Sequence, residues 1–189
     1  MMSAINWLPC IYFRMYTGIF TLLQAFFDIC RLRLGPQELP ASPFLLAVTL
    51  LFYTVCGIGL ALITIPPFQA TLSGITETIL VALLTVVLLR VRSMPERWIQ
   101  SLTALAGTGI ILSLIALPLS LWLHELRAAE ADIRVPGLLL FALVVWNVVI
   151  MAHILRHALS TSFGIGLLLA VGYLWIIVST LNALFPVMV

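Results

Sequence analysis

Five long apolar runs, separated by short connections, constrain this chain more than any other feature of its sequence. We place these runs at about residues 44–65, 71–89, 99–123, 136–155 and 163–185. Because an α-helix rises about 1.5 Å per residue, roughly 20 residues cross the hydrocarbon core of a bilayer. The runs therefore predict an all-α, polytopic integral membrane protein, with a transmembrane domain of five helices in residues 44–189.

The composition agrees with a chain solvated mostly by lipid and excludes several other classes of protein. The sequence is 63% hydrophobic and 8% charged, whereas soluble domains contain about 25% charged residues. Its nine basic residues are all arginine and are scattered, so no basic face for nucleic acid is expected. Cys10, Cys30 and Cys56 are widely spaced and lack paired histidines, which predicts neither a metal site nor a disulfide framework. We expect no metal and no cofactor.

Residues 1–33 form a segment of a different kind. Six polar residues recur there at intervals of three or four, namely Arg14, Thr17, Thr21, Gln24, Asp28 and Arg31. On a helix they make one polar stripe beside an aromatic surface, which predicts an amphipathic helix lying in the membrane interface. A sixth span packed against the others is the alternative. The segment lacks the basic start of a signal peptide, so we expect it to be retained. Residues 34–43 contain three prolines and predict a stiff connector.

The distribution of arginine predicts the orientation. Seven arginines fall on one side of the five spans, namely Arg14, Arg31, Arg33, Arg90, Arg92, Arg97 and Arg156, and two fall on the other. By the positive-inside rule, the N-terminus is cytoplasmic and the C-terminus lies outside, in the inner (plasma) membrane of the cell. We expect the seven arginines, with His153 and His157, to contact lipid headgroups or a partner protein.

Two polar residues inside the predicted spans are candidates for a proton or ion site. Glu77 is the only acidic residue within a span, and a carboxylate in lipid is costly enough to suggest a function. If its helix begins near Thr71, Glu77 lies roughly 9 Å along the helix axis. If Gly74 is the cap, Glu77 lies in the first turn, where the helix dipole and the unpaired amides stabilise an anion. Pairing with a partner subunit or with a neighbouring span is a further alternative. Asn147 is expected to form a hydrogen bond with another helix.

Small residues at intervals of four predict close packing between helices. They are Gly57, Ala61, Ala104, Thr108, Ser162, Gly166 and Ala170. Such residues let two helix backbones approach, which is a main source of helix association in lipid. The contacts could lie inside the bundle, between copies in a homo-oligomer, or with a partner subunit of a membrane complex.

One segment resembles a known family. The stretch 145–168, VWNVVIMAHILRHALSTSFGIGLL, joins a Trp-containing span to a Ser- and Gly-rich helix start through a short turn with His and Arg. It is similar to the corresponding junction of Yip family proteins, and the order of parts over residues 34–186 also resembles that family. The resemblance implies a five-helix integral membrane protein without known catalytic residues. Eukaryotic members of the family are associated with small GTPases and vesicle traffic.

The sequence is compatible with two classes of function. No phosphate loop, GxSxG or HExxH motif is present, so we expect a protein that is not an enzyme. The first function is a scaffold, assembly factor or accessory subunit of a membrane complex. The alternative is a small-solute or proton-coupled carrier or channel that uses Glu77 and Asn147.

Overall fold

A computed structural model describes the backbone of residues 8–185 and the side chains from residue 20 onward. Arg14 and Thr17 of the predicted polar stripe therefore lie outside the described side chains. The regular elements of the described chain are all helical and include two short 3-10 turns, η1 (Pro36–Glu38) and η2 (Pro95–Arg97). The helices are α1 (Leu8–Cys30), α2 (Pro43–Ala61), α3 (Pro67–Val91), α4 (Trp98–Ala128), α5 (Arg134–Ala158) and α6 (Phe163–Leu184).

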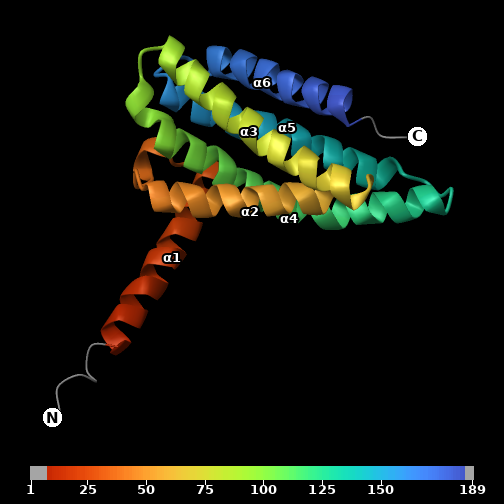
Figure 1. The fold of residues 1–189 in the computed structure, drawn as a ribbon, viewed down its shortest axis with the longest axis horizontal. Coiled ribbons are helices and arrows are strands. Elements are labelled where there is room, and N and C mark those ends of the chain that lie inside the picture. Colours follow the sequence, from red (N-terminus) through yellow and green to blue (C-terminus); the bar gives the residue numbers. More distant parts are fainter. Residues whose placement is uncertain (1–7, 186–189) are drawn as a thin grey trace.

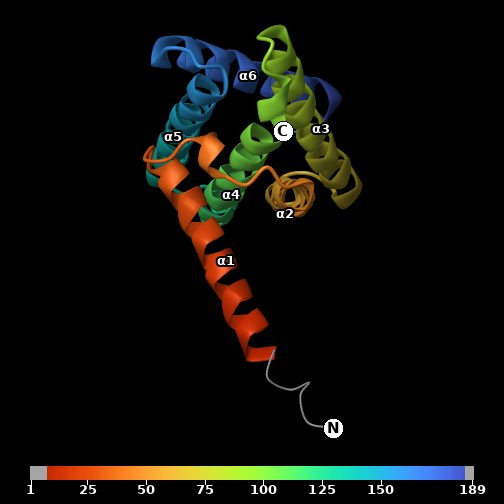
Figure 2. The ribbon, with the colours of Figure 1, turned by 90° about the vertical axis from the view of Figure 1, so that its left-hand side faces the viewer.

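Helices α2 to α6 are each long and apolar enough to cross a membrane. They run side by side with alternating direction (Figure 1). The connections 31–42, 92–97 and 159–162 therefore gather at one end of the bundle, which we call the arginine-rich end and which faces the viewer in Figure 2. The predicted all-α, five-span fold class is confirmed. The interfacial position of the N-terminal helix stays a prediction.

Helix α4 lies at the centre of the bundle and packs against α2 and α5, while α3 lies against α2 and α6 lies against α5. The residues of α4 from Ser101 to Thr108 are all buried. Hydroxyl groups tolerate this position because they can bond to their own helix: Thr103 donates to the carbonyl of Ile99, and Thr108 to that of Ala104.

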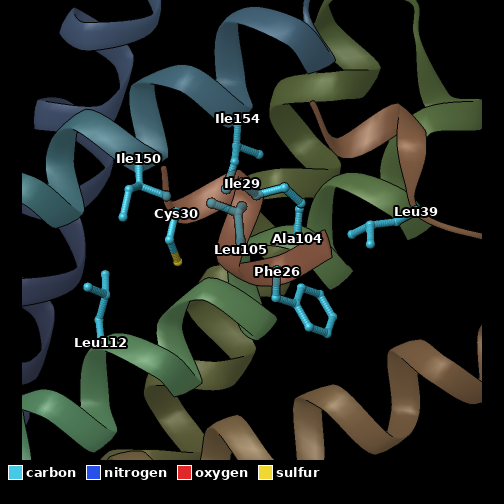
Figure 3. Packing of buried hydrophobic residues seen from close by; sticks show 9 residues of the cluster. All are labelled: Phe26, Ile29, Cys30, Leu39, Ala104, Leu105, Leu112, Ile150 and Ile154. Atoms are coloured by element: carbon cyan, nitrogen blue, oxygen red, sulfur yellow. The ribbon is translucent and has the colours of Figure 1, made fainter. Parts of the chain in front are cut away.

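The last turns of α1 are fixed to the bundle by an apolar cluster (Figure 3). Phe26 and Ile29 of α1 pack there with Leu105 of α4 and Ile154 of α5. Gly107 of α4 makes room for this contact, because a Cβ atom at that position would collide with the Phe26 ring. The rest of α1 projects away from the bundle in both views (Figures 1 and 2).

Four helices end with the same turn. In each turn, a residue other than glycine adopts a positive φ between 51° and 61°, namely Leu32, Ser93, Glu130 and Ser160. After α5, for example, the amide of Ser160 bonds to the carbonyl of His157, and the amide of Thr161 bonds to that of Arg156. This is the Schellman motif, which satisfies the last carbonyls of a helix and usually places glycine at the left-handed position.

The boundary between α2 and α3 differs from the prediction. We expected Pro66 and Pro67 to close one span and the next to begin near Thr71. In the structure α2 already ends at Ala61, and Pro67 is the first residue of α3. Proline suits the first helical position, because the N–H that it lacks would have no partner there. This earlier start moves every residue of α3 deeper into its helix.

Candidate functional site

Glu77 lies well inside a candidate transmembrane helix. Because α3 begins at Pro67, Glu77 lies about 15 Å along the helix axis. Gly74 lies within the helix and is not its cap, so the interpretation of Glu77 as a first-turn, capped carboxylate is wrong. The carboxyl group needs a partner of another kind.

That partner is Tyr53 of α2. Its hydroxyl group donates to Oε1 of Glu77 at 2.6 Å, and one residue further along both helices the hydroxyl oxygens of Thr54 and Thr78 lie 2.8 Å apart. Gly74 of α3 allows this approach: a Cβ atom there would lie 3.0 Å from the amide nitrogen of Ile58 and 3.3 Å from the carbonyl oxygen of Thr54, both in the backbone of α2. Of the alternatives predicted for Glu77, the one observed in the structure is therefore pairing with a residue of a neighbouring span.

A second cluster of polar side chains joins α3 to α6. The buried hydroxyl of Tyr173 donates to the carbonyl of Val81 at 2.7 Å and lies 3.0 Å from the hydroxyl of Thr85. Thr85 donates to the same carbonyl at 2.7 Å. Both side chains are satisfied inside the bundle, which keeps their burial from destabilising it.

A small cavity lies between the Tyr53–Glu77 pair and the Tyr173–Thr85 pair. Its volume is about 40 Å³, and its walls are Tyr53, Val81, Leu105, Thr108, Gly109, Asn147, Met151 and Tyr173. Asn147 makes no hydrogen bond with any residue of the described part of the chain, in contrast to the bond expected from the sequence. The cavity has room for about one water molecule, which its polar walls could bind. The arrangement can hold a proton between the carboxyl and phenol groups, but a cavity of about 40 Å³ is too small for a solute much larger than water.

The arginine-rich end contains a larger and more polar pocket of about 530 Å³. It is lined by Gln37, Arg97, Arg156, His157, Ser160, Thr161, Ser162 and Phe163. The predicted contact residues Arg97, Arg156 and His157 thus come together, although Arg97 lies at the end of η2 and the other two lie in the last turn of α5. Arg31, Arg33, Arg90 and Arg92 are exposed near the same end but do not line the pocket.

His153 does not make the predicted contact with lipid headgroups. It is only 4% exposed, and its Nε2 atom lies 2.9 Å from the carbonyl oxygen of Leu34. The ring therefore ties α5 to the connector after α1 and does not face lipid. Across the described side chains, no three His, Cys, Asp or Glu residues lie close enough together to hold a metal ion.

The predicted small residues occupy several kinds of position. Gly166 and Ala170 of α6 face α5, where a Cβ atom on Gly166 would lie 2.6 Å from the carbonyl oxygen of Ala152. Ala104 and Thr108 are buried in α4, and Ala61 is the half-buried last residue of α2. Ser162 is exposed and caps α6, where its hydroxyl accepts from the amide of Ile165 at 3.5 Å.

No family model, curated protein or solved structure matches this chain. The resemblance to the Yip family therefore stays a prediction. Sequence reasoning also missed Tyr53, Tyr173 and the pocket around Thr161. The sequence did contain a signal for Tyr53. Small and polar residues recur at helical spacing in two segments, at Tyr53, Thr54 and Gly57 and at Gly74, Glu77 and Thr78.

Proposed function

We propose that the chain is a non-enzymatic membrane protein that acts as a scaffold, assembly factor or accessory subunit and presents α1 to a partner. The observation that carries this proposal is the position of α1, whose described side chains contact the bundle near the C-terminal end of the helix. Phe20 and Phe27 of this helix are 63% and 54% exposed. An aromatic helix face that leaves its own bundle needs lipid or a partner to cover it.

The interior of the bundle supports the same proposal. Glu77, Tyr53, Tyr173 and Thr85 bond to groups of the chain itself, and the cavity between them admits about one water molecule. Such an arrangement stabilises helix packing without a substrate. The lipid bilayer covers the outward faces of the spans, and the resemblance to the Yip family points to the same class of non-catalytic membrane protein.

Site-specific photocrosslinking tests the proposed role of α1. A photoreactive residue is placed at Phe20 or Leu23, with Leu138 of α5, which is 68% exposed, as the matched control. We expect a discrete protein adduct from the two α1 positions and only lipid adducts from position 138. Equal protein adducts from all three positions, or lipid adducts alone, would contradict the proposal.

The proposed orientation has its own test. We propose that the N-terminus and the arginine-rich end face the cytoplasm of a cell with this protein in its inner membrane, because seven of the nine arginines lie on that side. A C-terminal fusion to a reporter that is active only outside the cytoplasm should then be active. A fusion to a reporter that is active only in the cytoplasm should be silent, and the reverse result would refute the orientation.

A carrier or channel is the second candidate, and one observation favours it. Asn147 of α5 lines the same cavity as Tyr53, whose hydroxyl bonds to Glu77, so polar groups continue from α3 across the bundle. Proton flux into vesicles reconstituted with the protein distinguishes the two functions. A carrier predicts flux that Glu77→Gln abolishes, whereas a scaffold predicts that neither protein supports flux above that of empty vesicles.

A further inference from the structure

The pocket at the arginine-rich end combines positive charge with a lack of carboxylate partners. Arg97 at the end of η2 and Arg156 of α5 both line it. The ion pair that the described side chains form is Arg134 with Asp132, on the opposite connection of the bundle. Neither pocket arginine therefore has a carboxylate within 4.0 Å among those side chains. Two unpaired guanidinium groups beside one cavity favour an anionic ligand.

Both guanidinium groups are already held in place by the protein. Nη1 of Arg97 donates to the carbonyls of His157 and Ala158 and to the hydroxyl of Ser160 at 3.3, 3.2 and 2.8 Å. These bonds cap the C-terminus of α5 and leave the other guanidinium nitrogens without an acceptor in the described chain. Nη2 of Arg156 lies 3.2 Å from His157, and its guanidinium carbon lies 5.9 Å from the centre of the Phe163 ring. Groups held in this way lose little freedom when a ligand binds.

The loop between α5 and α6 adds neutral donors. The hydroxyl oxygen of Thr161 is buried and has no hydrogen-bond partner among the described residues, although Thr161 lines the pocket. A buried hydroxyl without a partner is costly, and an oxygen atom of a ligand would satisfy it. The amides of Phe163 and Gly164, the first two residues of α6, have no acceptor within their own helix, and Phe163 lines the pocket. Arginine, hydroxyl and helix amide groups are those that proteins use to bind phosphate oxygens.

We infer that this pocket binds a phosphate group, presented either by the headgroup of an anionic phospholipid or by a free phosphate compound. Its volume of about 530 Å³ is ample for a phosphate with an attached group. Because α5 ends and α6 begins at this point, the pocket lies where apolar spans meet the headgroup layer. The inference goes beyond the proposed function, since a partner bound to α1 does not require it.

Two arms of one experiment distinguish the sources of phosphate. In the first, the delipidated protein in a non-ionic detergent is heated with sodium phosphate or with sodium chloride at equal ionic strength. In the second, native mass spectrometry counts the molecules of phosphatidylglycerol or phosphatidylcholine that the protein retains from mixed micelles. A rise in melting temperature specific to phosphate supports a free compound, and preferential retention of phosphatidylglycerol supports the lipid. If the wild-type chain shows neither effect, the inference is overturned.

Variants show whether the pocket is responsible. Arg156→Gln should weaken the observed binding at least about tenfold, since it removes a charged hydrogen-bonding group. Arg92→Gln removes the same charge from the same end outside the pocket, and should change binding less than about twofold. Equal losses in the two variants would show attraction to the general surface charge and would overturn the inference. Arg156→Lys provides a second comparison if Arg156→Gln does not fold.

Thr161→Val gives a sharper test because it separates binding from stability. Without a ligand, the variant should be as stable as the wild-type chain or more stable, since it removes a buried hydroxyl that has no partner. Its phosphate or phosphatidylglycerol binding should nevertheless fall several-fold. Ser101→Ala is the matched control, because Ser101 also has a buried hydroxyl without a partner but does not line the pocket. Unchanged binding in Thr161→Val would refute the role of this hydroxyl and the geometry proposed for the site.

Discussion

Replacement of Gly166 by alanine should destabilise the bundle, whereas the same replacement at Gly172 of the same helix should not. A Cβ atom at position 166 would lie 2.6 Å from the carbonyl oxygen of Ala152 and 3.1 Å from Cβ of Arg156, while one at position 172 meets nothing within 4 Å. The first contact involves backbone of α5, which cannot move aside as a flexible side chain can. The two helices must therefore separate locally.

The magnitude follows from this geometry. Ordinary contact begins near 3.4 Å, so a Cβ atom at 2.6 Å requires a shift of about 0.8 Å. Overpacking of this kind costs about 1–3 kcal/mol, whereas alanine in place of a helix-interior glycine gains roughly 0.5–1 kcal/mol. Gly172→Ala should show only the gain in stability from alanine. Gly166→Ala should show this gain together with the cost of overpacking. We expect the free energies of unfolding of the two variants to differ by about 1–3 kcal/mol.

Unfolding in mixed micelles measures this difference. Tryptophan fluorescence is followed as sodium dodecyl sulfate replaces a non-ionic detergent, and the free energies of the two variants are compared with that of the wild-type chain. The comparison requires that the transition be two-state, which coincident fluorescence and circular dichroism curves would establish. If Gly166→Ala and Gly172→Ala were equally stable within about 0.3 kcal/mol, the close approach of α5 and α6 would be refuted.

Three further predictions concern other parts of the chain. Tyr53→Phe should lower the free energy of unfolding by about 1–3 kcal/mol, since Glu77 loses the hydroxyl that donates to it at 2.6 Å; no loss in the detergent titration would mean that the bond contributes nothing. Glu130→Gly should stabilise the protein by up to about 1 kcal/mol, because Glu130 is exposed and has a φ of 52°; a lower melting temperature would contradict this. Burial raises the pKa of the Cys30 thiol to about 11, so the reactive thiolate is scarce below that pH. In a chain that retains only this cysteine, maleimide should therefore label the folded protein slowly at pH 8 and the unfolded protein rapidly, and equal rates would show that Cys30 is accessible.

The five-span fold could be predicted because it depends on features that are local in sequence. Each apolar run is about as long as a bilayer is thick, and the observed spans differ from the predicted ones by a few residues. The difference that mattered for the site arose at Pro66 and Pro67, since proline can follow one helix or begin the next. A choice between these two roles decided whether Glu77 was near the end of its helix or well inside it.

The polar contacts could not be predicted in the same way, because they depend on how each helix is rotated about its axis. Tyr53 and Glu77 are 24 residues apart, and Arg97 and Ser160 are 63 residues apart. Apolar faces all around a helix, as in these spans, give no hydrophobic stripe from which its rotation could be inferred. The burial of His153 could not be predicted for the same reason, because the rotation of its helix was unknown and its basic neighbours suggested a surface position.

The connector after α1 has a consequence for how the molecule sits in a bilayer. Gln100 of α4 donates to the carbonyl of Leu39 at 2.7 Å, and His153 of α5 bonds to that of Leu34. Together with the apolar cluster around Phe26 and Ile29, these bonds join α1 to the spans at a defined angle rather than through a loose tether. A helix that rests along the membrane surface would then hold the spans at one tilt, and a partner that lifted α1 would change that tilt.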